Sequence, residues 1–356
     1  MKRSSSPERI ILTFKKISGL LITDLFSIRY FSGFTGSSAV ILITPKYRYF
    51  LTDFRYKVQS GQEVKKGYKL IFYQKKLLDE IINIIKKERI KRLGIEERNI
   101  PYDLIRSIID KTNIKPVDCS EELQIYRRLK SPEEVNSIRK ALLCAEMSFQ
   151  KVLPLIKPGI SEKDVATELE YCMKKNGATG ISFPIIVASG KRSALPHAHP
   201  TNKKIRPNDL VIIDFGANIN GYNSDTTVTI KLGKTNNLLN EAYRTVRKSI
   251  DLALSMIKVN TKTSDIDRKI HEFIIARGFK DGLIHSLGHG VGLDIHESPT
   301  ISRNKDDFFQ KGMVFTIEPG IYIENIGGVR IEVMAHLSDK GVKILNSPSF
   351  NNNFLT

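Results

Sequence analysis

Cysteine is scarce in this sequence. The 356 residues include three cysteines, Cys119, Cys144 and Cys172, which are widely spaced and form no CxxC pair. An odd, scattered trio is typical of reduced thiols rather than of a disulfide framework. We therefore expect three free thiols that serve as core filler in a cytoplasmic protein.

Long apolar runs are also missing. The N-terminal sequence MKRSSSPE is followed only by the short apolar stretch IILTF before two lysines. This stretch is too short for the apolar region of a signal peptide, and no segment of the chain is long enough to span a bilayer. We expect a soluble intracellular protein without a membrane partner.

Acidic residues are outnumbered by basic ones, 38 to 56, which gives a formal charge of +18. Clustered Lys and Arg would favour nucleic acid, because phosphate contacts release counterions. The basic residues instead lie along predicted helix faces at 86–89, 127–130 and 244–248. We interpret them as solvated surface. Nucleic acid is not the expected partner, although a basic non-catalytic binding module remains the alternative from another functional class.

The chain is too long for one ordinary core, so two domains are expected. An α/β domain is predicted over residues 1–125, since short apolar strands there alternate with segments that have apolar residues at helical spacing. The predicted strands are 20–24, 39–44, 49–53, 69–73 and 91–96, and the predicted helices are 76–88 and 101–111.

A second domain is predicted over residues 126–356. Ser131, Pro132 and Glu134 form an N-cap, a first-turn proline and a capping-box carboxylate, which together predict a helix start. Within this domain, residues 257–278 repeat the pattern of 156–177 at a distance of 101 residues. Each copy follows a similar helix and precedes an apolar strand with an acid, LVIIDFG or MVFTIEPG. The repeat predicts an α+β domain with an internal pseudo-twofold, in which two acidic hairpins face one cleft.

Five potential metal ligands lie in this second domain. They are four carboxylates and one imidazole: Asp214, Asp225, His289, Glu318 and Glu332. Such an oxygen-rich set is typical of a two-metal hydrolytic centre rather than of a structural zinc site. His289 lies between two glycines, which would let the backbone pass close to a metal.

The carboxylates fall into two pairs that are symmetric about turn-like sequences. Asp214 and Asp225 would face each other in a hairpin that turns at the Ile–Asn bond of ANINGYN. Glu318 and Glu332 would do so in a hairpin centred on Asn325. Buried carboxylates in pairs repel unless a cation neutralises them, so the pairs favour metal ions.

Three further histidines and an arginine are candidates for supporting roles. His197, in a loop rich in Ser, Gly and Pro, and His296 could donate a hydrogen bond to an oxyanion or transfer a proton. His285 would be a ligand only in a helix, which the glycines disfavour, so we interpret it as a supporting residue. Arg330 could orient the site carboxylates. The plainer alternatives are surface histidines and, for Arg330, a surface ion pair.

These segments resemble the pita-bread metallopeptidases, and specifically the Xaa-Pro aminopeptidase and prolidase family. The resemblance covers nearly the whole chain. In the second domain it is carried by DFGANINGYNSD, GHGVGLDIHESP, FTIEPGIY, GGVRIE and SALPHAHPT. In the first domain, YFSGFTGSSAVILI and LTDFRY resemble the creatinase-type N-terminal domain, which methionine aminopeptidases lack.

The resemblance implies a peptidase with two divalent ions, Mn²⁺ or Co²⁺ first and Zn²⁺ or Fe²⁺ as alternatives. Asp225 and Glu332 would contact both ions, Asp214 one of them, and His289 and Glu318 the other. A hydroxide shared by the ions would attack an Xaa-Pro bond at the N-terminus of a peptide.

In the same family scheme, Glu318 would accept the proton of the nucleophile, and His197 and His296 would steady the oxyanion. The family also implies a homodimer. All five ligand positions hold the expected residue type, which favours an enzyme over a binding module. An aminopeptidase of the same fold with another specificity remains the closest alternative.

Overall fold

The computed structural model describes residues 16–280 and 284–350, and the chain divides into two compact units between Arg127 and Arg128. The predicted boundary, between residues 125 and 126, lies inside helix α6 (Ser120–Arg128). The N-terminal sequence in which we expect no leader lies outside the described residues. None of the described helices is long and apolar enough to cross a membrane.

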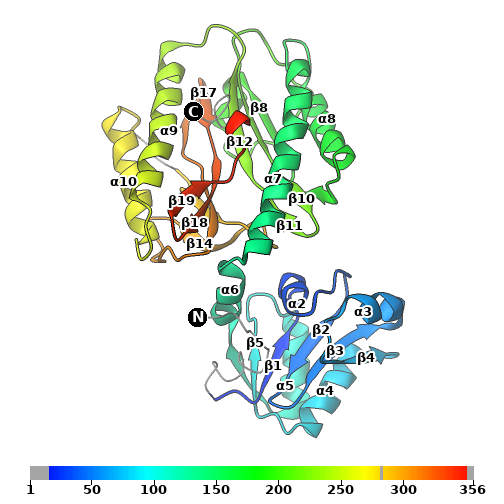
Figure 1. Ribbon diagram of the computed structural model, residues 1–356. Helices are drawn as coiled ribbons and strands as arrows, with labels where there is room; N and C mark the ends of the chain where they lie inside the picture. Colours follow the sequence, from blue (N-terminus) through cyan, green and yellow to red (C-terminus); the bar gives the residue numbers. More distant parts are fainter. Residues whose placement is uncertain (1–15, 281–283, 351–356) are drawn as a thin grey trace. The chain divides into compact units, whose positions relative to one another are not determined.

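The first unit is a six-stranded mixed sheet with helices on both faces (Figure 1). Its strand order is β4-β3-β2-β1-β5-β6. All five predicted strands and both predicted helices are confirmed. The strands are β1 (Gly19–Ile22), β2 (Val40–Ile43), β3 (Arg48–Asp53), β4 (Tyr68–Tyr73), β5 (Arg92–Ile95) and β6 (Lys115–Asp118). The helices are α2 (Leu25–Ser32), α3 (Lys57–Glu63), α4 (Leu77–Lys87), α5 (Tyr102–Thr112) and α6.

The three layers arise because successive side chains of the central strands point to opposite faces of the sheet. On β1, Leu20 and Ile22 pack with α2 on one face, and Leu21 packs with α4 and α5 on the other. A strand buried on both faces needs apolar residues at every position, and LLI meets that condition.

The second unit begins with a helix that starts where the sequence predicts. α7 (Pro132–Val152) has Ser131 as its N-cap, with both hydrogen bonds of the capping box to Glu134. The strands of the second unit lie between the helix pair α7–α8 and the helix pair α9–α10 in Figure 1. The other helices are α8 (Glu162–Lys175), α9 (Asn237–Met256), α10 (Thr263–Ala276) and α11 (Pro348–Phe350).

The strands of the second unit form several small sheets. The two that matter for the site have the orders β12-β9-β8 and β14-β13-β15-β18-β19, and the hairpins β10–β11 and β16–β17 extend from them. The strands are β7 (Gly180–Ile181), β8 (Ile186–Ser189), β9 (Leu210–Phe215), β10 (Ala217–Ile219), β11 (Tyr222–Asn223), β12 (Thr226–Lys231), β13 (Gly288–Gly290), β14 (Glu297–Ile301), β15 (Val314–Ile317), β16 (Gly320–Ile323), β17 (Gly327–Arg330), β18 (Val333–Ser338) and β19 (Gly341–Ile344).

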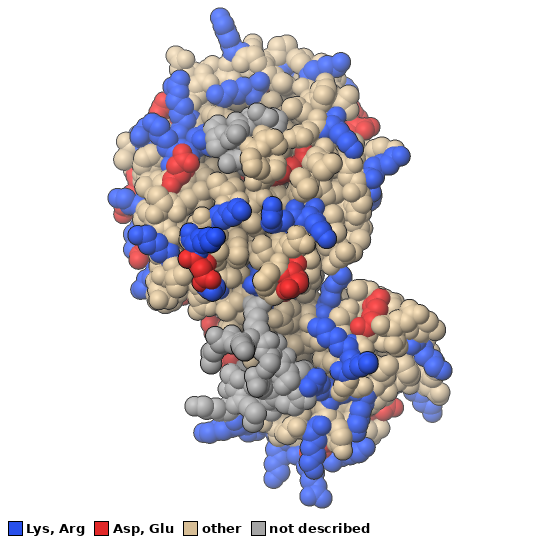
Figure 2. Space-filling view, in the orientation of Figure 1, with Lys and Arg blue, Asp and Glu red and all other residues tan. Residues whose placement is uncertain are grey.

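The predicted duplication is visible in the order of elements. Helix α10 begins and ends 101 residues after helix α8, and each follows a long helix and precedes a hairpin with two acids. Both halves contribute to one continuous apolar core. The cysteines are free, with Cys119 and Cys144 buried and Cys172 half-buried, as expected for core filler. Lys and Arg are scattered among neutral and acidic side chains on the face of this unit in Figure 2.

Candidate metal centre

The first acidic hairpin differs from its predicted register. Asp214 on β9 faces Thr227 on β12, so the predicted direct pairing of Asp214 with Asp225 is wrong. The turn lies at Asn220–Gly221, one residue later than predicted, and both residues have positive φ, 49° and 76°. A two-residue turn of type I′ requires positive φ at both central positions, and Asn-Gly supplies it. Asp225 consequently lies between β11 and β12.

The second acidic hairpin has the predicted register. Phe315 faces Ala335 in the β15–β18 ladder, and Ile321 faces Val329 in the β16–β17 ladder. Both ladders are centred on Asn325, whose φ is +60°. Glu318 and Glu332 lie between the two ladders, where this register puts them opposite each other.

The two hairpins are joined through β12. Glu332 donates its backbone N–H to the Thr227 carbonyl at 3.0 Å, and Thr227 Oγ1 donates to Glu332 Oε2 at 2.9 Å. Thr229 exchanges two hydrogen bonds with the Arg330 backbone. These contacts bring the acids of the two halves to one place, as the repeat predicts.

Three of the five predicted ligands lie close enough to share one ion. One oxygen or nitrogen atom from each of Asp225, His289 and Glu332 lies within 4.8 Å of the others. His289 Nε2 is 3.5 Å from both Asp225 Oδ2 and Glu318 Oε1. Its Nδ1 lies 3.1 Å from the Gly290 carbonyl, which leaves Nε2 directed at the carboxylates.

The carboxylates of Asp225 and Glu332 are buried, those of Asp214 and Glu318 are largely buried, and the set has too few hydrogen-bond donors. Asp214 Oδ1, Asp225 Oδ1 and Glu332 Oε1 are buried and have no partner among the described residues. Burial, and then the neighbouring carboxylates, raise the pKa of Asp225 and of Glu332 well above the usual range. Burial also raises the pKa of Glu318 and lowers that of His289. A divalent cation would neutralise this set and bind the unpartnered oxygens, so the residues fit a metal centre.

The glycines around His289 have close neighbours in the sheet. A Cβ at Gly288 would lie 2.1 Å from the Thr316 carbonyl oxygen, and one at Gly290 would lie 2.3 Å from that of Ser298. The glycines therefore permit a close approach of neighbouring strands to β13.

Arg330 is buried, so the alternative of a surface ion pair is wrong. Its Nη2 donates to Asp214 Oδ2 at 2.6 Å, and its Nη1 donates to the hydroxyl of Tyr322 at 2.8 Å and to the Pro196 carbonyl at 3.0 Å. Asp214 and Tyr322 contribute to raising the pKa of Arg330, and its charge compensates the surrounding carboxylates.

Sequence reasoning missed Tyr322. Its hydroxyl lies 3.0 Å from His285 Nε2, while His285 Nδ1 is 2.8 Å from the Ser286 carbonyl. Both ring nitrogens of His285 thus have partners, and burial lowers the pKa of the ring. The even spacing between Glu318 and Tyr322 indicates one strand face, which could have identified the tyrosine.

The two predicted proton-handling histidines are exposed. The ring of His296 lies edge-on to that of His289, with centroids 4.4 Å apart. His197 follows Pro196, the residue whose carbonyl binds Arg330. The residue as a whole is exposed, but the protein around the His296 ring partly desolvates it and lowers its pKa, and the charges of His289 and His197 add to the effect.

The chain matches two family models. Residues 136–339 match metallopeptidase family M24, and residues 9–128 match the creatinase/prolidase N-terminal domain. An Xaa-Pro dipeptidase of Pyrococcus furiosus is 37% identical over 92% of this chain and 93% of its own length.

Two solved structures extend the comparison. An Xaa-Pro dipeptidase from Bacillus anthracis has a TM-score of 0.92 and 37% identity over 96% of this chain and 97% of its own. An X-Pro aminopeptidase from Thermotoga maritima has a TM-score of 0.87 and 34% identity, with the same coverage. The predicted fold class is confirmed. The chain thus belongs to metallopeptidase family M24, with a creatinase/prolidase N-terminal domain, and is an enzyme that hydrolyses peptides with divalent metal ions.

Proposed function

We propose that this enzyme cleaves Xaa-Pro bonds at the N-terminus of peptides, as an aminopeptidase P or a prolidase. The observation that carries the proposal is the set of buried, unpartnered carboxylate oxygens around His289 Nε2. The names of the relatives, Xaa-Pro dipeptidase and X-Pro aminopeptidase, support the proline specificity.

Two divalent ions are proposed, and their ligands would be Asp214, Asp225, His289, Glu318 and Glu332. When bound, such ions supply a hydroxide nucleophile at neutral pH and polarise the scissile carbonyl. One imidazole among four carboxylates is a hard ligand set that suits Mn²⁺ or Co²⁺ and also accepts Zn²⁺ or Fe²⁺.

The side chains around the ions would bind and move protons. Glu318 accepts the proton of the nucleophile and passes it to the leaving proline nitrogen. His197 and His296, both exposed, donate hydrogen bonds to the substrate carbonyl as it becomes an oxyanion. Arg330 holds Asp214 in place, and the Tyr322 hydroxyl accepts a hydrogen bond from the same guanidinium group.

Metal analysis of the purified protein, with activity before and after chelation, tests the metal centre. We expect two divalent ions per chain, loss of hydrolysis with chelator, and recovery on adding Mn²⁺ or Co²⁺. Retained hydrolysis in metal-free protein would contradict the proposal.

A substrate panel tests the specificity. It contains Xaa-Pro dipeptides, longer peptides with proline in second position, and Met-Ala peptides. Cleavage of the proline substrates is expected, and their relative rates distinguish a prolidase from an aminopeptidase P. Hydrolysis of the methionine peptides alone would favour the alternative, an aminopeptidase of the same fold with another specificity.

Two glutamates of one hairpin provide a matched pair of variants. Glu318→Gln should lower kcat by about a hundredfold or more, as expected for loss of a general base. Glu324→Gln changes an exposed carboxylate at the turn and should leave kcat unchanged. Equal activity of both variants would contradict the role of Glu318.

We further propose, from the family alone, a homodimer located in the cytoplasm. Light scattering of the full chain during size-exclusion chromatography should give twice the monomer mass of 40.3 kDa. A monomer mass at micromolar concentration would contradict the dimer.

A further inference from the structure

A buried carboxylate outside the proposed ligand set, that of Glu162, binds both ends of the loop before β9. Glu162 lies in the first turn of α8 and is fully buried. Its Oε1 accepts from the backbone N–H and the hydroxyl of Ser189, both at 2.9 Å. Its Oε2 accepts from the N–H and hydroxyl of Thr201, at 3.1 and 2.8 Å, and from Arg192 Nε at 3.0 Å.

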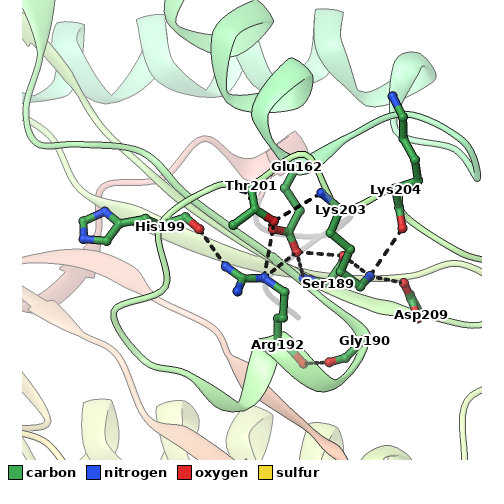
Figure 3. Close-up of polar contacts among 10 residues, drawn as sticks. Glu162, Ser189, Gly190, Arg192, His199, Thr201, Lys203, Lys204 and Asp209 are labelled. Carbon is green, nitrogen blue, oxygen red and sulfur yellow. Dashed lines mark hydrogen bonds and ion pairs between the residues drawn. The ribbon is translucent and has the colours of Figure 1, made fainter.

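One carboxylate therefore closes the loop 189–201 at both ends (Figure 3). Arg192 extends the contact into the middle of the loop, because its Nη2 donates to the His199 carbonyl at 2.7 Å. On the other side, the Pro196 carbonyl is held by Arg330. His197 lies between these two anchored carbonyls, so its backbone position depends on both arginines.

The internal repeat shows that the fold does not need a charge at this position. The equivalent residue in the second half is Thr263, the first residue of α10. Glu162 donates its N–H to the Lys203 carbonyl at 3.1 Å, and Thr263 donates its N–H to the Asp307 carbonyl at 2.9 Å. The backbone arrangement is thus the same with a neutral side chain. At this position of the repeat, only the half that carries His197 has a carboxylate.

A fully buried carboxylate is costly unless it is paired and hydrogen-bonded, and here four backbone and hydroxyl donors and an arginine meet that condition. We propose that Glu162 is a positioning residue: through Arg192 it fixes the segment 196–199 and so holds His197 in its working position. This inference rests on the proposed function, because it assigns His197 a task at the substrate.

A mutant cycle between Glu162 and His197 tests the inference on the metal-loaded enzyme with an Xaa-Pro substrate. Glu162→Gln keeps the size of the side chain but turns an NH₂ group toward donors, which displaces the loop. Because small misplacements of a reacting group cost up to about a hundredfold, kcat should fall about ten- to hundredfold with KM changed less than about twofold. His197→Ala should lower kcat about a hundredfold.

The decisive value is that of the double variant. If Glu162 acts through His197, the double variant has the kcat of His197→Ala within about twofold. Glu170→Gln, an exposed change on the same helix, is the control and should leave kcat unchanged. Should Glu162→Gln fail to fold, Arg192→Ala replaces it, since Arg192 is partly exposed and its loss frees the His199 carbonyl.

The outcomes separate the two proposals. Losses that multiply in the double variant, or an unchanged kcat in Glu162→Gln, would overturn the inference while the proposed function stands. A metal-loaded wild-type enzyme without any Xaa-Pro hydrolysis would overturn the proposed function, and the inference with it.

Discussion

Replacing Asp225 with asparagine should stabilise the second unit when metal is removed and destabilise it when metal is bound. In metal-free protein the Asp225 carboxylate lies beside those of Glu332 and Glu318, and one of its oxygens has no hydrogen-bond partner. The substitution removes a buried charge from this set. In the metal-loaded protein the same substitution removes a proposed ligand, so the sign of the effect reverses.

The magnitude follows from the geometry. The ligand atoms of Asp225 and Glu332 lie within 4.8 Å of each other. At an effective dielectric constant of about 20, two unit charges at that distance repel by about 3.5 kcal/mol. Partial protonation relieves some of this repulsion, because both pKa values are raised, so we expect a gain of about 1–3 kcal/mol at pH 8. Metal at about a hundred times its Kd contributes about 2.7 kcal/mol to the native enzyme, and the variant should lose most of this.

Urea unfolding of wild type and Asp225→Asn, each with chelator and with saturating Mn²⁺, measures both terms. The control is Asp265→Asn, an exposed change on α10, which should alter the free energy of unfolding by less than about 0.5 kcal/mol in either condition. A variant that is less stable than wild type in both conditions would refute the reasoning, because the carboxylates would then not repel in the metal-free state.

Three further changes have defined outcomes. Burial raises the pKa of Glu96 to about 7, and a carboxyl with a raised folded pKa loses its stabilising contribution as the pH rises through that value. As the pH rises from 5 to 9, the free energy of unfolding of Glu96→Gln should therefore increase by up to about 3 kcal/mol relative to that of wild type, as measured by urea titrations. A difference between the two proteins that does not change with pH would contradict this. Lys130→Met leaves Glu297 as an unpaired buried charge and should cost about 3–5 kcal/mol in thermal unfolding; the further change Glu297→Gln should recover much of the loss. Gly328→Ala places a Cβ 2.3 Å from the Ser193 carbonyl oxygen and should cost about 1–3 kcal/mol, whereas unchanged stability would show that the loop yields freely.

Local patterns in the sequence predict much of this fold. The start of α7 follows from Ser131 and Glu134, whose capping bonds form within one turn. The register of the second hairpin follows from the symmetric placement of Glu318 and Glu332 about Asn325. The predicted turn of the first hairpin lies one residue too early, because the prediction assumes that Asp214 and Asp225 pair directly. The observed turn is set by Asn220–Gly221, which adopts the positive φ that a type I′ turn requires.

Contacts between segments far apart in the chain are harder to predict from the sequence. Arg330 was expected to be either a site residue or a surface ion pair, since its position in the strand does not reveal what covers it. The structure buries it against Asp214, Tyr322 and the Pro196 carbonyl, which come from separate segments of the chain. The close contacts of the glycines around His289 could not be predicted for the same reason, because their neighbours are the carbonyls of other strands.

The sequence by itself determined the residue types of the candidate ligands, the two acidic hairpins, the repeat of α8 in α10 and the family. These are properties of spacing and local conformation, which a period of two or 3.6 residues and the chemistry of turns encode directly. Only the tertiary structure decided which side chains surround the carboxylates, that Tyr322 joins Arg330 to His285, and that Glu162 anchors the His197 loop. Each of these depends on burial, where a charge must find its partners among segments far apart in the chain.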